Sequence, residues 1–429
     1  MLQILTFLVG LTAISVGLLL SPIPRNLGFY KWVAQNVRYP EAVGTAPAYL
    51  DEKDWGFTFE QLYNYDLRGQ TALVTGGNSG TGYATALALT RLGASVTIAC
   101  RSEGRCLAAV ETIKTDRDYK GHIEIGVMDT SQLASVKNFA ATYMKSHEKL
   151  DMLFLNAGIG SAGVNDDGSA PLSEDGIEMV FATNHVGHHL LYKLLEPLVL
   201  KSPLARIVLT SSGGSFTTFE YKVATDLETL NTADVKRLEN YGQSKLAQVL
   251  WAKELTRRLG PNSSVHVNAA HPGAVNTGIW EKNPLIPKKM MGIINYFRTH
   301  AMWTAAEGAL TLLYLGVATD QLVAKNIRGK YFHPQSIEIV NPLALDEDLQ
   351  KKVWDFSDEL VQGYKLDPPP EPPVVVEEEV PPEEEVMAPV ETEEAEEVVD
   401  ESTKAEEVVQ EDAKPAAEVH PGTAETTAA

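Results

Sequence analysis

Short apolar runs alternate with longer amphipathic runs along the middle of the chain. Seven runs are rich in β-branched residues and have strand length: TALVT, SVTIAC, HIEIGVMD, DMLFLNAG, ARIVLTSS, VHVNAAHPG and a final KYF. The segments between them repeat apolar residues at intervals of three and four, which is typical of helices that cover a sheet. The alternation predicts an α/β domain over residues 67–366, with a doubly wound Rossmann-type fold and a seven-stranded parallel sheet.

The beginning of the chain does not share this alternation. Residues 1–20 contain no charged side chain, and this apolar run has about the ~20 residues that cross a bilayer as a helix. We expect a transmembrane anchor at 1–21 rather than a cleaved signal peptide, because no basic residue precedes the run. Arg25, Lys31 and Arg38 follow it closely, in a membrane-proximal linker that covers 22–66. The positive-inside rule then predicts a single-pass protein whose catalytic domain faces the cytosol, and we expect the endoplasmic reticulum as its membrane.

The other end of the chain, residues 367–429, is acidic and of low complexity. It holds 21 Asp and Glu against 2 Lys, so the rest of the chain carries only about −2 of the formal charge of −21. This composition, which lacks aromatic residues, predicts a disordered acidic tail: a solvated extension, or an arm that docks a protein partner. A nearly neutral body and an acidic tail both argue against binding to nucleic acid.

The cysteines and a cluster of histidines invite two structural interpretations. Cys100 and Cys106 lie six residues apart, and we expect free thiols in a reducing compartment rather than a disulfide framework. His185, His188 and His189 fall on one predicted helix, but no carboxylate or cysteine lies near them in sequence. We therefore expect no metal site, with one or two of these histidines buried and the rest solvated.

A glycine-rich turn follows the first predicted strand. In the run TGGNSGTG, Gly76, Gly80 and Gly82 permit a tight turn and a close approach of a pyrophosphate to the amino terminus of the next helix. Arg101 ends the second strand, where a nicotinamide-binding fold inspects the adenosine ribose. Because a guanidinium suits a 2′-phosphate, we expect NADP(H) to be preferred over NAD(H). Asp129, after the third strand, is placed to accept from the adenine amine.

Candidate acid–base residues follow the fifth strand. Tyr241 and Lys245 stand four residues apart at the start of a predicted helix, so both lie on one face. An ammonium favours phenolate and so lowers a tyrosine pKa from its usual value of about 10, which makes Tyr241 a usable acid or base. Lys245 is also suited to hold the nicotinamide ribose hydroxyls. Ser211 and Ser212 offer a hydroxyl to a carbonyl oxygen, and Asn184 is suited to hold a water of a proton relay.

Six motifs in order, TGGNSGTG, NAGIG, FATNHVGHHLL, IVLTSS, YGQSK and HPGAVNT, resemble the short-chain dehydrogenase/reductase family over the body of the chain. The resemblance implies a catalytic tetrad of Asn184, Ser212, Tyr241 and Lys245, and Ser212 is preferred to Ser211 by the family's pattern only. TNHVGHHLL, IACR and KKVWDFSDEL are similar to the retinol dehydrogenase and WW-domain oxidoreductase branch, which commonly carries an N-terminal anchor, although no WW domain is visible here. The expected cofactor-binding residues are Gly76, Asn78, Ser79, Gly80, Thr81, Gly82, Arg101, Asp129, Asn156, Ala157, Gly158, Tyr241, Lys245, Pro272, Gly273, Val275 and Thr277.

The substrate side is predicted to be apolar. Residues 280–300 form an irregular, methionine-rich stretch that suits a lid over a lipophilic alcohol or carbonyl, such as a retinoid, steroid or fatty aldehyde. The alternative is that it packs on the domain or the bilayer, with Lys288 and Lys289 near anionic headgroups. Two other functions remain open. One is reduction of a ring double bond, as in the protochlorophyllide reductases that the body also resembles, whose extra cysteines are absent here. The other is a membrane-tethered nucleotide-binding adaptor, which would not need the tetrad.

Overall fold

The computed structural model describes residues 56–216, 218, 222–232, 239–278 and 302–366. The predicted anchor, most of the linker, the predicted lid and the acidic tail lie outside these residues. Within these ranges, no helix combines the length and the apolar character needed to span a membrane.

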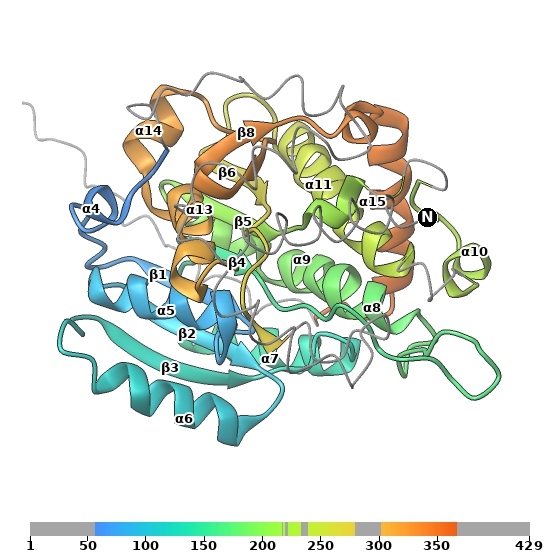
Figure 1. The fold of residues 1–429 in the computed structure, drawn as a ribbon, viewed down its shortest axis with the longest axis horizontal. Coiled ribbons are helices and arrows are strands. Elements are labelled where there is room, and N and C mark those ends of the chain that lie inside the picture. The colour runs from blue at the N-terminus through green and yellow to red at the C-terminus, as the bar shows by residue number, and fades with distance from the viewer. Residues whose placement is uncertain (1–55, 217, 219–221, 233–238, 279–301, 367–429) are drawn as a thin grey trace, which may run out of the picture. The chain divides into compact units, whose positions relative to one another are not determined.

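Eight strands form one sheet in the order β3-β2-β1-β4-β5-β6-β7-β8 (Figure 1). They are β1 (Thr71–Thr75), β2 (Ser95–Cys100), β3 (His122–Val127), β4 (Met152–Leu155), β5 (Ala205–Thr210), β6 (Val265–Ala270), β7 (Tyr331–His333) and β8 (Ile337–Ile339). The first seven pair in parallel, and β8 pairs antiparallel with β7. The prediction of seven strands in an all-parallel sheet was therefore wrong in its last element. An edge strand of three residues after a tight turn is too short to produce a recognisable sequence pattern.

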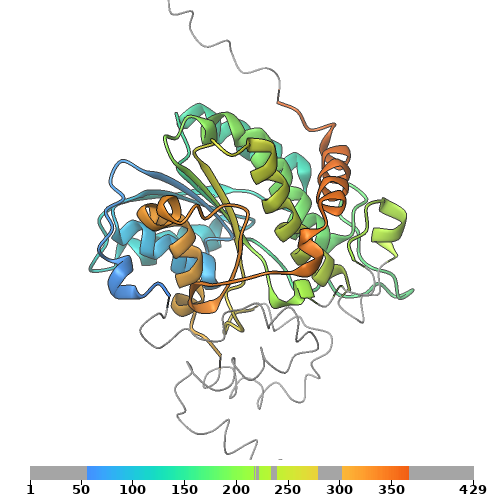
Figure 2. The ribbon, with the colours of Figure 1, turned by 90° about the horizontal axis from the view of Figure 1, so that it is seen from above.

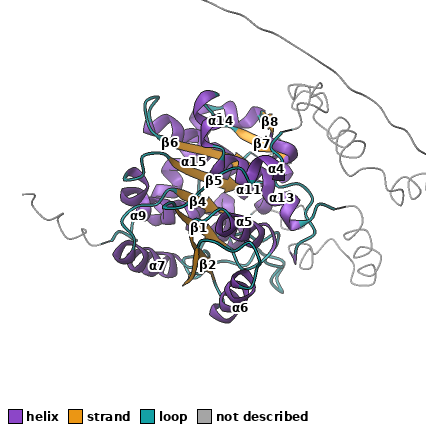
Figure 3. Ribbon diagram, turned by 90° about the vertical axis from the view of Figure 1, so that its left-hand side faces the viewer, coloured by secondary structure: helices purple, strands orange, loops and turns teal. Residues whose placement is uncertain are grey.

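Helices cover both faces of the sheet, and Figure 3 shows the strands between the two groups. One group comprises α4 (Phe59–Leu62), α5 (Gly80–Arg91), α6 (Glu103–Lys114), α13 (Ala305–Val317) and α14 (Thr319–Ala324). The other comprises α7 (Leu133–Ser146), α8 (Met179–Phe181), α9 (Gly187–Leu200), α11 (Glu239–Leu259) and α15 (Glu347–Val361), with the short α10 (Leu227–Asn231) nearby. This two-sided cover explains why β4, β5 and β6 are buried along their whole length instead of alternating between buried and exposed residues.

The C-terminal helix α15 completes the core on the α11 side, and Figure 2 shows it, in orange-red, beside α11. Trp251 of α11 stacks on Trp354 of α15 with ring centroids 5.6 Å apart. Tyr192 of α9 meets Trp251 edge to face at 5.2 Å. All three side chains are buried, so this aromatic cluster joins three helices into one layer.

A π-helical segment, Ala182–Val186, separates α8 from α9 and carries the first of three buried histidines. His185 and His189 hydrogen bond to Ser357 and Asp358 of α15, at 2.8 and 2.9 Å. His188 points the other way, toward β1. The expectation that some of them remain solvated was wrong, because α15 covers the helix face that sequence periodicity left open.

A disulfide joins Cys100, the last residue of β2, to Cys106 of α6, and the expectation of free thiols was therefore wrong. The short connection folds the first turn of α6 back over the strand end. This brings the two Cα atoms to 6.3 Å, a separation that a disulfide spans.

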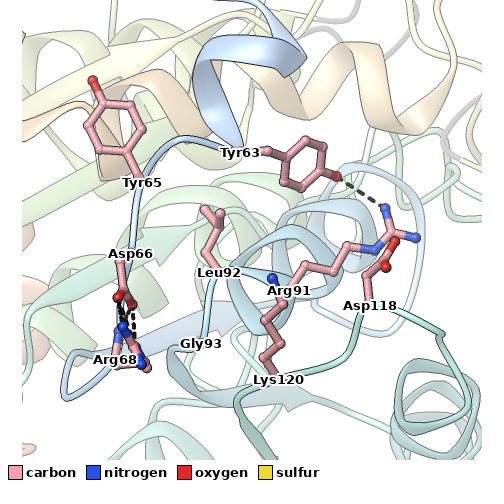
Figure 4. A pocket seen from close by; sticks show the side chains of 9 residues that line it. All are labelled: Tyr63, Tyr65, Asp66, Arg68, Arg91, Leu92, Gly93, Asp118 and Lys120. Carbon is pink, nitrogen blue, oxygen red and sulfur yellow. Dashed lines mark hydrogen bonds and ion pairs between the residues drawn. The ribbon is translucent and has the colours of Figure 1, made fainter.

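A cavity of about 680 Å³ lies at the amino-terminal ends of β1, β2 and β3, away from the motifs that follow the strands (Figure 4). Two of its cations have protein partners: Arg68 forms an ion pair with Asp66, and Arg91 donates to the Tyr63 hydroxyl at 3.1 Å. Its lining is Tyr63, Tyr65, Asp66, Arg68, Arg91, Leu92, Gly93, Asp118 and Lys120. Because ligands of doubly wound sheets bind at the carboxyl ends of the strands, the functional site is expected at the opposite edge.

Candidate active site

The glycine turn connects β1 to the amino terminus of α5. Gly76 and Gly80 have positive φ angles of 67° and 56°, which favour glycine. A Cβ at Gly82 would lie 2.4 Å from Asn156 Nδ2 and 2.5 Å from the Gly76 carbonyl oxygen, so no other residue fits there. Ser79, the N-cap residue, makes no side-chain capping bond. The first turn of α5 therefore keeps backbone amides for an anionic ligand.

Asn156 fastens this turn to the loop after β4. Its side-chain amide donates to the Thr75 carbonyl at 2.9 Å, and its Oδ1 accepts from Thr81 Oγ1 at 2.9 Å and from Thr210 Oγ1 at 3.3 Å. The backbone amides of Asn156 and Ala157 both donate to Thr75 Oγ1, at 2.8 and 2.9 Å. The Thr81 hydroxyl thus adds a bond across the turn. Sequence reasoning did not single out Thr75, which anchors the whole loop.

Arg101 and Asp129 face each other just beyond β2 and β3. The guanidinium lies 3.7 Å from the Asp129 carboxylate, and the Arg101 side chain is 62% exposed. Asp129 also accepts from the backbone amide and hydroxyl of Ser131, at 2.9 and 2.7 Å, which fixes its orientation. The exposed guanidinium of Arg101 therefore lies at the end of β2, where the sequence predicted the adenosine ribose of the cofactor.

The loop after β6 closes over the glycine turn. Val275 pairs with Trp303 in a short parallel bridge, which ties this loop to the residues before α13. A Cβ at Gly80 would lie 3.0 Å from Thr277 Cγ2, so the two segments are in contact. Pro272, Gly273, Val275 and Thr277, all predicted to contact the cofactor, lie in this loop. Trp303 is a part of this arrangement that the sequence did not reveal.

Ser212, just after β5, and Tyr241 of α11 come together, and the nearby Ser212 hydroxyl lowers the Tyr241 pKa. Two other groups hold Ser212 in place. The Gly214 amide donates to Ser212 Oγ at 3.1 Å, and the Tyr331 hydroxyl donates to the Ser212 carbonyl at 2.8 Å. A Cβ at Gly214 would lie 3.0 Å from Tyr241 Cε1, so the glycine that follows the serines makes room for the phenol ring. Ser211 is buried and faces the other way.

Lys245 is buried one turn after Tyr241. Its Nζ donates to the Thr210 carbonyl at 2.7 Å and to Gln248 Oε1 at 3.2 Å, and it lies 5.8 Å from the centre of the Tyr241 ring. Burial lowers the pKa of Lys245 to about 7. Burial also raises the pKa of Tyr241, although the nearby Ser212 hydroxyl opposes this. The lowering of the Tyr241 pKa that the sequence suggested is thus outweighed by desolvation.

Asn184 lies in the π-helical segment and has protein partners on every polar group. Its Oδ1 accepts from the Ile159 amide at 2.8 Å, and its Nδ2 donates to the Ile159 carbonyl and to Ser244 Oγ, each at 3.0 Å. Its backbone carbonyl accepts from Gln248 Nε2 at 2.7 Å and from His188 Nδ1 at 3.0 Å. A Cβ at Gly158, the last residue of the NAG motif, would lie 3.0 Å from Asn184 Oδ1 and 3.4 Å from Lys245 Nζ.

The fold thus brings all four residues of the predicted tetrad to one edge of the sheet, beside the glycine turn. Ser244 and Gln248 were not singled out from the sequence. Gln248 had left a signal, because it is a polar residue within the apolar run LAQVLW of a buried helix.

Residues 70–224 match the family model described as short chain dehydrogenase. Retinol dehydrogenase 14 of Mus musculus is 33% identical over 309 residues, which cover 69% of this chain and 86% of that protein. The chain belongs to the short-chain dehydrogenase/reductase family. Human retinol dehydrogenase 13 is 33% identical over 301 residues, and this alignment covers 69% of the present chain and 85% of that protein. The WW domain-containing oxidoreductase of Gallus gallus is 31% identical over 307 residues, with coverage of 71% and 70%.

These relatives confirm the predicted branch of the short-chain dehydrogenase/reductase family. Among solved structures, an uncharacterized protein from Mycobacterium Paratuberculosis superposes with a TM-score of 0.51 at 26% identity, covering 72% of this chain and 98% of its own. The shared fold agrees with the predicted α/β Rossmann-type class. As a member of the short-chain dehydrogenase/reductase family, the chain is an oxidoreductase.

Proposed function

We propose that this short-chain dehydrogenase/reductase transfers hydride between NADP(H) and a hydrophobic alcohol or carbonyl, with Tyr241 as the general acid and base. The observation that carries the proposal is that the fold brings Ser212 and Tyr241 together around Gly214, with buried Lys245 5.8 Å from the centre of the Tyr241 ring. A hydroxyl pair at this edge of the sheet suits a carbonyl oxygen that must be oriented and protonated.

The side chains divide the chemistry among them. When bound, the nicotinamide donates or accepts the hydride. The Ser212 hydroxyl orients the substrate oxygen, and Tyr241 Oη gives it a proton in reduction or takes one in oxidation. Because burial raises the Tyr241 pKa, the phenol is neutral near pH 7, the form that donates. Lys245 has a third N–H, beyond the two used by Thr210 and Gln248, for a ribose hydroxyl.

The glycine turn fits a dinucleotide. Gly82 has no side chain, and the turn has no room for one, so a ligand can approach its backbone closely. The first turn of α5 lacks a side-chain cap, which favours binding of a pyrophosphate to its backbone amides. The exposed guanidinium of Arg101 suits a 2′-phosphate, which supports NADP(H) over NAD(H). Asn78, Ser79 and Thr81 belong to the same turn, and Asp129 is proposed to accept from the adenine amine.

The proposed substrate class is a lipophilic alcohol or carbonyl, such as a retinoid, steroid or fatty aldehyde. The similarity to proteins named retinol dehydrogenase supports this class. We further propose that residues 1–21 anchor the chain by a single span, with the catalytic domain facing the cytosol at the endoplasmic reticulum; their uncharged, apolar sequence supports the anchor. A lipophilic substrate partitions into the bilayer, so an anchored enzyme meets it at high local concentration.

The experiment that tests the proposal measures consumption of NADPH and NADH by the full-length protein in detergent. The panel contains retinoid, steroid and aliphatic carbonyls, and Tyr241→Phe is the blank. We expect turnover with NADPH on at least one class, at a rate a hundredfold or more above that of Tyr241→Phe. Tight NADPH binding without turnover on any carbonyl would instead favour ring reduction or the adaptor.

A further inference from the structure

Gln248 bridges two members of the tetrad with the two ends of one amide. It lies one turn after Lys245 on α11 and is fully buried. Its Oε1 accepts from Lys245 Nζ at 3.2 Å, and its Nε2 donates to the backbone carbonyl of Asn184 at 2.7 Å. Both polar atoms are used, and each has the role that its chemistry allows.

We propose that Gln248 is a positioning residue for hydride transfer, which ties the ammonium of Lys245 to the π-helical segment that carries Asn184. The inference rests on the proposed function, because positioning matters only if Lys245 serves the reaction. Gln248 itself is placed to touch neither substrate nor cofactor.

The Lys245 end of the bridge fixes where the ammonium points. An ammonium has three N–H groups, and the Thr210 carbonyl and Gln248 Oε1 accept from two of them. Nζ lies beside Gly158, so the third faces the loop over which the cofactor is proposed to lie. Both acceptors also stabilise the charged form against the burial that lowers the Lys245 pKa to about 7.

At the other end of the bridge, Gln248 Nε2 is one of two donors to the backbone carbonyl of Asn184 in the π-helical segment. The second donor is His188, whose Nδ1 lies 3.0 Å from the same oxygen. Since a carbonyl only accepts, His188 carries its hydrogen on Nδ1, and its Nε2 lies 3.0 Å from Thr75 Oγ1. A continuous chain of bonds therefore runs from Thr75 at the glycine turn, through His188, Asn184 and Gln248, to Lys245.

This arrangement changes the relay expected from the sequence. With two donors on the Asn184 carbonyl and partners on its side chain, the Gln248 amide stands between Asn184 and Lys245 where a relay water was expected. An amide does not pass protons readily, so its contribution is to hold Lys245 in place and charged.

Among the described residues, few titratable groups face Lys245, so a shift of its pKa can be assigned to a single change in its surroundings. Tyr241 is its neighbour on α11, His188 faces it from α9, and His271 faces it from the end of β6. Burial lowers the pKa of His188 to about 3 and that of His271 to about 4, so both stay neutral where Lys245 titrates. A change in the Lys245 pKa in a Gln248 variant therefore reports on the amide.

The test compares two replacements at Gln248 with a matched control. Gln248→Met keeps the shape and removes both polar atoms, whereas Gln248→Glu keeps an acceptor for Lys245 and loses the donor for Asn184. Gln243→Met is the control, because Gln243 is buried on the same helix and accepts from the Ala224 amide at 2.8 Å. It loses a buried hydrogen bond of the same kind without touching the bridge.

Two readouts follow the variants in the full-length protein. The first is the Lys245 pKa without cofactor, from ¹³C NMR of the lysine ε-carbons, with Lys245→Met to assign the signal. We expect Gln248→Met to lower this pKa by about one unit and Gln248→Glu to raise it, because a carboxylate favours the ammonium. The second is turnover with NADPH, where we expect Gln248→Met to lower kcat about ten- to a hundredfold, with a smaller change in KM.

The proposal is overturned if Gln248→Met and Gln243→Met give the same Lys245 pKa and the same kcat. If Gln248→Met does not fold, Gln248→Asn replaces it; its amide is one methylene short, so an unchanged Lys245 pKa in that variant counts equally against the bridge. A wild-type protein without turnover on any carbonyl contradicts the proposed function alone, since the NMR titration still decides whether Gln248 holds the ammonium.

Discussion

The Ser211 hydroxyl donates a hydrogen bond of 2.7 Å to the backbone carbonyl of Lys245. This bond joins the end of β5 to α11 and turns Ser211 away from the site, so that Ser212 is the serine beside Tyr241. The two neighbouring hydroxyls therefore have different predicted roles, one structural and one chemical.

Replacing the two serines in turn separates these roles. Ser211→Ala leaves a buried carbonyl without this donor, so we expect a loss of about 1–3 kcal/mol in the free energy of unfolding. Ser212→Ala is expected to lower kcat a hundredfold or more while leaving stability nearly unchanged. Chemical unfolding and steady-state kinetics on both variants check this, and the reverse pattern would assign the chemistry to Ser211.

Removal of the Tyr241 hydroxyl tests the proton transfer. Because Ser212 and Lys245 remain in Tyr241→Phe, we expect NADPH to bind with unchanged Kd. Turnover should fall by a hundredfold or more, the usual scale of acid–base catalysis. Fluorescence titration of NADPH and initial rates measure the two quantities. Undiminished turnover would exclude Tyr241 as the acid.

Arg101→Ala tests the cofactor preference. Loss of the exposed guanidinium should weaken NADPH far more than NADH, because only NADPH carries the 2′-phosphate. Arg117→Ala is the control, since it removes the same charge from a side chain that is 93% exposed and lies next to Asp118, near the amino-terminal ends of the strands. Binding constants for both nucleotides decide the matter, and equal losses for the two in Arg101→Ala would remove the case for the phosphate.

The buried histidines predict how stability depends on pH. Burial lowers the pKa of His188 to about 3 and that of His271 to about 4. Unfolding restores the usual value of about 6.5, so the unfolded chain binds protons that the folded chain does not. The contribution of these two histidines to stability is thus fully present above about pH 7 and is lost as the pH falls from 6.5 toward their folded-state pKa values, at a limiting rate of about 1.4 kcal/mol per pH unit for each group.

Urea unfolding between pH 7.5 and 5 measures this slope. His188→Gln removes one titrating group and should reduce the slope, whatever it does to stability at pH 7.5. A slope identical to that of the wild-type protein would show that His188 is not buried and neutral in the folded state.

The local patterns of the sequence predicted much of the fold. The strand-length runs gave β1 to β7, and motif spacing placed the glycine turn before a helix and Tyr241 and Lys245 on one helix face, whereas the predicted catalytic roles came from the resemblance to the family. These features depend on residues close together in the chain. The misses were the edge strand β8, the π-helical segment and the Cys100–Cys106 bridge, because each depends on geometry that composition and periodicity do not encode.

By itself, the sequence determined the order of strands and helices, the glycine turn and the residue types of the site, because periodicity and motif spacing are local. Only the tertiary structure decided which serine meets Tyr241, that α15 covers His185 and His189, and that Gln248 joins Lys245 to Asn184. Those contacts join residues that are distant in the chain or turned by a change of helix type. Their partners are chosen by packing and by the need of buried polar groups to find hydrogen bonds.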